Sequence, residues 1–206
     1  MPLVEFDLRG LAPGQAPGRE AVAPAAEADA LLVRGPVPAL AGVLTALWKA
    51  GRTAAAPVSW EPAGDGDSAA LARALGIGTG GERELGLVRD DHGGVLLHHG
   101  RLEAAGEDER RRPLVRRLGA QAHHDAVKVA DGQVTRFDVR PDWRAVDTLD
   151  VTVMTLPLRP GRRTSGRAVQ IACDPARVIR DGVPYARPVT RWTWYADDRV
   201  RWRLQP

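Results

Sequence analysis

Apolar residues recur at helical spacing in the first quarter of the chain. The residues that share one helical face are Leu40, Val43, Leu44 and Leu47. This spacing predicts a helix over residues 39–50 with one buried face. Gly51 is placed to end it, because glycine readily adopts the left-handed conformation that closes helices.

A second region, residues 58–77, begins with a strand pattern and ends with a helix pattern. β-forming residues at 58–60 are followed by Pro62, which cannot donate to a sheet, and by Gly64 and Gly66, which permit a tight turn. Such a turn between a strand and a helix is where α/β folds place ligands, because free backbone N–H groups and the positive end of the helix dipole meet there. The turn is therefore a candidate ligand site.

The helix predicted after this turn has a start signal and a stop signal. Either Asp67 or Ser68 can act as its N-cap, and Gly76 follows its last apolar residue. Its apolar residues Leu71, Ala74 and Leu75 recur at helical spacing.

Two strands are predicted before the first helix. Residues 4–8 alternate apolar and polar side chains, which indicates a half-exposed or edge strand, whereas residues 30–33 form a short apolar run typical of a buried parallel strand. Residues 9–28 are dominated by Gly, Pro and Ala and are expected to form a mostly irregular connection. These elements predict a small parallel α/β layer over residues 1–80.

The pattern changes beyond residue 80, where short β-forming runs alternate with Asp-Gly and Pro-Gly turn signals. A single charged helix is expected over residues 107–117. We predict a larger, mainly antiparallel, sandwich-like β domain over residues 81–206, with the boundary near residues 78–83. The predicted strands are 84–88, 95–98, 126–129, 134–139, 149–156, 168–172, 176–179, 190–195 and 200–204.

Composition and charge narrow the class of protein. The chain has 206 residues, is 44% hydrophobic and has a formal net charge of +3. It contains no apolar run long enough to span a bilayer, and its first residues do not resemble a signal peptide, so we expect a cytoplasmic protein. The single cysteine, Cys173, is expected to be a small buried apolar residue.

The positive charge is concentrated in the C-terminal part. Residues 1–80 contain six basic and eight acidic side chains, and the remaining residues contain 23 and 18. Almost all the basic residues are arginines in an alanine- and glycine-rich chain, a bias that a GC-rich genome also produces. Arginine abundance is therefore weak evidence for phosphate binding.

The histidines suggest a metal site, but their spacing disfavours one. Adjacent residues on a strand point to opposite faces, so the pairs His98-His99 and His123-His124 can each supply only one inward ligand. His124 followed by Asp125 could form a base with an orienting carboxylate, but no nucleophile is identifiable. We assign no metal ligands.

The densest basic segment, residues 159–167, contains the anion-binding candidates Arg162, Arg163 and Arg167. Such a segment suits a small anionic ligand or a lipid headgroup, and a nucleic-acid partner is disfavoured. The alternative is that arginines simply occupy the exposed positions of half-buried strands, as the alternation of arginine and tryptophan over residues 191–204 suggests.

The two glycine-containing turns resemble a known family. The first reads Gly35-Pro36-Val37-Pro38 after a buried strand. The second reads Gly64-Asp65-Gly66-Asp67-Ser68, and its helix ends Ala72-Arg73-Ala74-Leu75-Gly76. In order and position they are similar to the Gly-Gly-Asp-Gly-Thr and Pro-x-Gly-Thr-x-Asn-Asp motifs of diacylglycerol kinase-type lipid kinases, which share a superfamily with NAD kinases. Arg180-Asp181-Gly182 in the later half is also similar in kind to a turn of that family.

The departures from the family motifs bear on activity. In the family, the glycines of the first loop let backbone N–H groups approach the phosphates of ATP. Here Pro36 and Pro38 remove two donors from that loop. The second loop has Asp65 and Asp67 where the family has Thr and Asn, and these carboxylates would repel a phosphate unless a cation intervened.

The resemblance implies two alternatives for function. The first is a diacylglycerol kinase-like protein with a degenerate nucleotide site, which binds a small ligand, a lipid headgroup or a partner without efficient catalysis. The second is an active kinase that uses ATP and Mg²⁺ to phosphorylate a lipid or another hydroxyl acceptor. A homo-oligomer is compatible with either. The nucleotide- or metal-binding candidates are Gly35, Gly64, Asp65, Gly66, Asp67 and Ser68.

Overall fold

The computed structural model describes residues 3–106, 116–145, 147–156 and 161–205. The helix expected over residues 107–117 falls almost entirely outside these ranges. Among the described residues, no helix is both long and apolar enough to cross a membrane.

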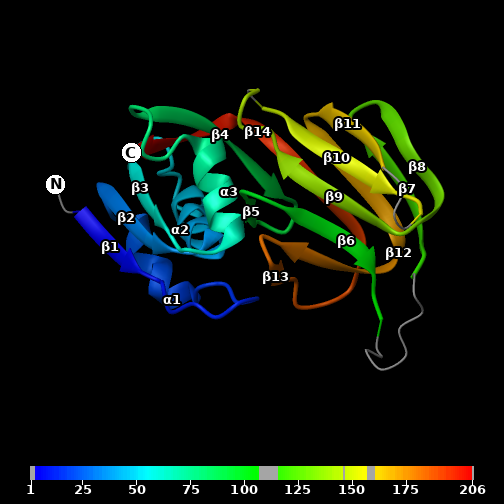
Figure 1. Ribbon diagram of the computed structural model, residues 1–206, viewed down its shortest axis with the longest axis horizontal. Coiled ribbons are helices and arrows are strands. Elements are labelled where there is room, and N and C mark those ends of the chain that lie inside the picture. The colour runs from blue at the N-terminus through cyan, green and yellow to red at the C-terminus, as the bar shows by residue number, and fades with distance from the viewer. Residues whose placement is uncertain (1–2, 107–115, 146, 157–160, 206) are drawn as a thin grey trace.

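The N-terminal part is a three-stranded parallel layer with two main helices (Figure 1). The strands pair in the order β1, β2, β3, and β1 forms the edge of the sheet, as its alternating pattern predicted. The elements of this layer are β1 (Leu3–Asp7), β2 (Ala30–Gly35), α2 (Val37–Lys49), β3 (Val58–Pro62) and α3 (Gly66–Leu75).

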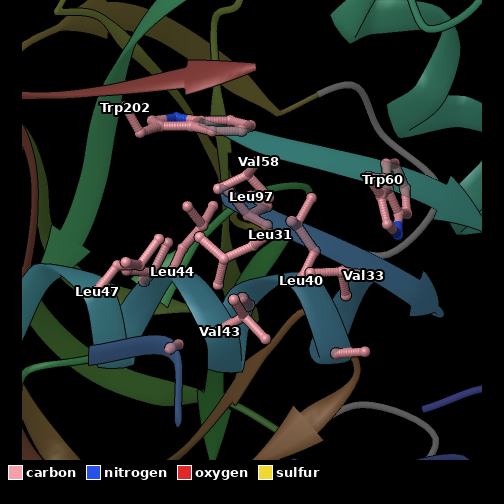
Figure 2. Packing of buried hydrophobic residues seen from close by; sticks show 14 of the residues in the cluster. Leu31, Val33, Leu40, Val43, Leu44, Leu47, Val58, Trp60, Leu97 and Trp202 are labelled. Atoms are coloured by element: carbon pink, nitrogen blue, oxygen red, sulfur yellow. The ribbon is translucent and has the colours of Figure 1, made fainter. Parts of the chain in front are cut away.

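Helix α2 forms because one of its faces is continuously apolar. Leu40, Leu44 and Leu47 have no exposed surface and point toward the buried side chains of β2 and β3, including Leu31 and Val58 (Figure 2). The helix predicted over residues 39–50 is therefore confirmed, and it begins two residues earlier.

The connection between β1 and β2 contains two short helical segments, α1 (Arg19–Val22) and the 3₁₀ helix η1 (Ala23–Ala26). The prediction of a mostly irregular connection missed them, because neither is long enough to show a periodic pattern. The connection packs closely on α2: a methyl group on Gly42 would lie 2.3 Å from Cγ of Pro17. The absence of a side chain at residue 42 thus lets the connection approach the helix.

The C-terminal part is almost entirely β-structure. Strands β6, β7, β11 and β13 were not predicted, since their sequences are short or rich in Gly, Ala and Arg rather than in β-branched residues. The strands are β4 (Arg83–Asp90), β5 (Val95–Leu96), β6 (Gly100–Ala104), β7 (Leu118–His124), β8 (Val127–Val134), β9 (Arg136–Pro141), β10 (Leu149–Met154), β11 (Arg162–Gly166), β12 (Ala168–Arg180), β13 (Val183–Pro184) and β14 (Val189–Gln205).

Two predicted pairs of short strands are in fact single long strands. Residues 168–172 and 176–179 both belong to β12, and residues 190–195 and 200–204 both belong to β14. Each strand keeps its pairing across an irregularity, between Ala172 and Ala176 in β12 pairing β14 and between Asp197 and Arg201 in β14 pairing β4. Such bulges interrupt the alternation of side chains, which made each strand read as two.

Strand β14 joins the two parts of the molecule. It runs antiparallel to β12 and β4, and its last residues pair in parallel with β3, so that Leu204 lies opposite Val58. Figure 1 shows its C-terminal end beside β3, and Figure 2 shows Trp202 of β14 over the core of the first layer. The result is a mixed sheet, with a parallel α/β layer followed by antiparallel strands.

The core of the C-terminal part is built around two tryptophans. Trp192 and Trp194 lie two residues apart on β14, are fully buried and pack edge to face with ring centroids 5.7 Å apart. The two tryptophans therefore share one buried face of the strand. Cys173 is half-buried beside this core, and burial raises the pKa of its thiol to about 11.

Candidate functional site

The parallel pairing of β2 and β3 brings the two glycine-containing loops together. Gly35 lies opposite Pro62 in the register, and its carbonyl oxygen accepts hydrogen bonds from the Trp60 indole N–H (3.0 Å) and the Ala63 backbone N–H (3.0 Å). The carboxyl ends of parallel strands are where α/β folds bind ligands. These two loops therefore define the candidate site.

The first loop has few free donors. Pro36 is the N-cap of α2 and Pro38 lies in the first turn, so neither has a backbone N–H. The N–H of Ala39 donates to the Pro36 carbonyl oxygen at 2.9 Å. Of the four described residues 36–39, only Val37 keeps an N–H that could turn to a ligand, and Val37 is itself buried.

In the second loop, the carboxylate of Asp65 is already hydrogen-bonded within the protein. Asp65 is the N-cap of α3, and its two carboxylate oxygens accept from the Ser68 N–H (2.8 Å) and the Ser68 hydroxyl (2.6 Å). Burial opposes ionisation of Asp65, but these hydrogen bonds outweigh it and hold its pKa below the usual value. The N-cap predicted at Asp67 or Ser68 is therefore wrong: Ser68 lies inside the first turn and is a donor to the cap.

Asp67 is an exposed acidic group of this loop that does not cap the helix. Its side chain is 73% exposed, and one carboxylate oxygen lies 3.5 Å from Nε2 of His98. Burial, together with the positive charge of Arg140, lowers the pKa of His98, and the charges of Asp67 and Asp181 oppose that shift. The loop of the first layer and the β part thus meet at His98.

Asp181 anchors the β side of the site. It is buried and adopts a positive φ of 47°, and its carboxylate accepts hydrogen bonds from the backbone N–H groups of Leu97 (2.9 Å), His98 (2.8 Å) and His99 (2.9 Å). Its own N–H donates to the His99 carbonyl oxygen at 2.8 Å. Burial raises the pKa of Asp181, although the three N–H groups oppose this. Asp181 therefore holds the loop that carries His98.

A second ionic cluster supports the same loop from β9. Nε2 of His99 lies 2.9 Å from Asp138, which also accepts from Nε of Arg101 (3.1 Å) and Nε of Arg136 (2.7 Å). Burial favours the neutral form of Asp138, but these donors outweigh it and place its pKa well below the usual range. The cluster therefore holds His99, the neighbour of His98 in this loop.

The anion-binding candidates lie elsewhere. Arg162 and Arg163 are on β11, at the opposite end of the sheet from β1. Arg163 pairs with Asp150 (2.5 Å) and Arg167 pairs with Asp198 (2.6 Å). The fold does not bring these arginines to the two loops.

The histidines are also dispersed. Nδ1 of His124 lies 2.7 Å from the Thr164 hydroxyl, while the Asp125 carboxylate accepts from the backbone N–H groups of Arg167 and Ala168. Asp125 thus has backbone partners rather than the His124 ring. Among the described residues, no three His, Cys, Asp or Glu side chains gather as a metal-ligating group.

Comparison with solved structures places the chain in a known fold. A putative diacylglycerol kinase from Bacillus anthracis str. Sterne matches with a TM-score of 0.66 and 11% identity, covering 92% of this chain and 82% of the other. An NAD kinase from Archaeoglobus fulgidus, solved in complex with ATP, matches with a TM-score of 0.55 and 13% identity, covering 93% and 82%. No family model matches the sequence, and no curated protein matches it.

These likenesses establish the fold of diacylglycerol kinase-like and NAD kinase proteins, which the two loops had suggested. At such low identity they establish the fold alone.

The fit of the two loops to ATP and Mg²⁺ is poor. In the first loop, Pro36 and Pro38 have no N–H, and the N–H of Ala39 is already donated to the Pro36 carbonyl oxygen. In the second loop, the Asp65 carboxylate is already hydrogen-bonded to Ser68. A phosphate at the α3 end would also meet the negative charge of Asp67. These features of the described residues oppose the binding of a triphosphate at the two loops.

Sequence reasoning missed the β side of the site. His98 was considered only as a metal ligand, and Asp181-Gly182 mainly as a turn signal, although it was noted as similar in kind to a turn of the kinase family. The usable signal was Asp181 itself, since a non-glycine residue before glycine in a tight turn often adopts a positive φ. The loop that it binds lies over 80 residues earlier in the chain, so periodicity could not reveal the contact.

Proposed function

We propose that this chain is a ligand-binding protein with a diacylglycerol kinase-like fold and a degenerate nucleotide site, and that it does not transfer phosphate efficiently. The observation that carries the proposal is the first turn of α2. Pro36 and Pro38 have no N–H, and Ala39 donates to Pro36. Phosphate sites at helix N-termini depend on those donors.

The second loop supports the same conclusion. Asp65 and Ser68 satisfy one another as a helix cap, so neither has a free group directed at a phosphate. Losing a charge-assisted hydrogen bond of about 1.5–3 kcal/mol weakens binding roughly 10- to 100-fold per contact. Because these losses multiply, losing several contacts would leave a nucleotide site with little affinity.

One observation favours the alternative of an active kinase. The Asp67 carboxylate is largely exposed beside His98, at the junction of the two parts. Mg²⁺ often binds through one or two carboxylates together with substrate phosphates. In an active enzyme, Asp67 would be the group of this loop available to hold the metal.

A phosphate-transfer assay separates the two functions. The full chain is incubated with diacylglycerol, magnesium and γ-labelled ATP, and the lipid fraction is measured for label. We expect no transfer above that of a heat-inactivated sample. Transfer that is lost in Asp67→Ala and retained in Arg73→Ala, an exposed residue of α3 outside the loop, would instead establish an active kinase.

A further inference from the structure

A cavity of about 680 Å³ lies along the outer side of α2. Its walls are the connection that contains α1 and η1, the turn between β4 and β5, and the turn between β12 and β13. Small-molecule sites commonly have volumes of about 300–1,000 Å³. The helix face that lines it bears mainly small side chains, such as Ala41, Gly42 and Ala46, so its floor is apolar.

The walls of this cavity are held by specific contacts. Pro17 packs against Gly42, and the Thr45 hydroxyl accepts from the Val95 N–H at 3.3 Å, which ties the β5 strand to the helix. Gly94 leaves room for the Arg180 guanidinium, which forms an ion pair with the fully buried carboxylate of Asp90. These contacts hold the walls of the cavity in place.

The charged groups around the cavity are mostly positive. Arg19 of α1 and Lys49 at the end of α2 line it, and neither has an acidic partner at ion-pair distance among the described residues. Arg180 is neutralised by Asp90. The carboxylate of Asp181, the acidic lining residue, is taken up by three backbone N–H groups. Two cations without an acidic partner among the described residues therefore lie at the edge of an apolar floor.

We propose that this cavity binds a small organic anion with an apolar body, whose carboxylate, sulfonate or phosphate group is held by Arg19 and Lys49. The apolar body lies against the alanine and glycine face of α2. The cavity is also lined by His92, whose ring stacks on Trp192 with centroids 4.5 Å apart. This inference does not rest on the proposed function, because the cations belong to α1 and the C-terminal end of α2 rather than to the strand-end loops.

The test uses two fluorescent probes that differ in charge. 8-Anilinonaphthalene-1-sulfonate is an aromatic anion, and N-phenyl-1-naphthylamine is the same aromatic body without the sulfonate. Each is titrated into the full chain at low salt, with fluorescence as the readout. We expect saturable binding of one anionic probe per chain, tighter than that of the neutral probe and weakened by salt, because the cations are exposed.

Variants locate the binding. Arg19→Gln and Lys49→Gln are each expected to weaken the anionic probe about two- to fivefold, which is the range for exposed ion pairs, and to leave the neutral probe unchanged. Ala46→Phe fills the floor and should abolish saturable binding of both probes. Arg73→Gln and Ala69→Phe on α3 are the matched controls, and neither should have an effect.

Three results would overturn the proposal. Equal affinity for the two probes would show that charge is irrelevant, and unchanged binding in Ala46→Phe would show that the probe lies elsewhere. Displacement of the anionic probe by millimolar inorganic phosphate alone would show a plain anion site with no use for an apolar body. Because no nucleotide is involved, a kinase activity found in the phosphate-transfer assay would leave this result standing.

Discussion

A methyl group on Gly35 would lie 2.9 Å from the carbonyl oxygen of Leu8. Gly35 also has a φ of +150°, a conformation that residues with side chains rarely adopt. The end of β2 thus passes so close to the end of β1 that this glycine is structurally required. Gly64, in the second loop, has open space around its Cα and no such restriction.

We predict that Gly35→Ala destabilises the protein by about 1–3 kcal/mol, the usual strain for a residue forced into a sparsely populated conformation. Gly64→Ala is the matched control and should change the free energy of unfolding by less than about 0.5 kcal/mol. Urea denaturation measures both. Equal effects of the two substitutions would show that the close approach to Leu8 is not maintained in solution.

The second prediction concerns the core of the β part. Trp194→Ala should lower the free energy of unfolding by about 3–5 kcal/mol, since the side chain is fully buried against Trp192. Leu3→Ala is the control, because Leu3 is 55% exposed on the edge strand. A denaturation midpoint that Trp194→Ala leaves unchanged would show that the tryptophan face is exposed and free to stack on a ligand.

The third prediction is a pH dependence at Asp138. Its folded-state pKa is lowered because hydrogen bonds from His99, Arg136 and Arg101 outweigh its burial. A lowered pKa contributes stability above the unfolded value of about 3.9, and that stability is lost as the pH falls below it. At neutral pH we expect Asp138→Asn to be less stable by about 1–3 kcal/mol.

The difference between wild type and Asp138→Asn should shrink as the pH falls from about 5 toward 2. Free energies of unfolding measured at several pH values test this. A difference that stays constant over that range would mean that Asp138 does not lose a stabilising charge on protonation.

The sequence predicted the first layer well because its signals are local. The apolar face of α2 repeats every three to four residues, and the buried strands β2 and β3 are bounded by Gly35 and Pro62. Strands β12 and β14 were each divided in two, because their irregularities break the alternation of side chains. The return of β14 to β3 could not be predicted, since parallel pairing between distant segments has no local signature.

The candidate site was predicted only where its signals are local in the sequence. The two loops after β2 and β3 follow from chain order, so their contact through Gly35 and Ala63 was foreseeable. The sequence placed the N-cap of α3 at Asp67 or Ser68 because Asp65, Asp67 and Ser68 are all good capping residues, and only the structure shows that Asp65 accepts from the Ser68 N–H. The binding of Asp181 to the loop of His98 needed the tertiary structure.

We propose above all that the two loops do not hold a nucleotide. Isothermal titration calorimetry of the full chain with ATP, with and without magnesium, tests it most directly. We predict no binding tighter than about millimolar in either condition, because roughly 10- to 100-fold is lost with each missing charge-assisted contact. Micromolar, magnesium-dependent binding that disappears in the Asp65→Ala and Asp67→Ala double variant would contradict the claim and show that the second loop holds the metal and the phosphates.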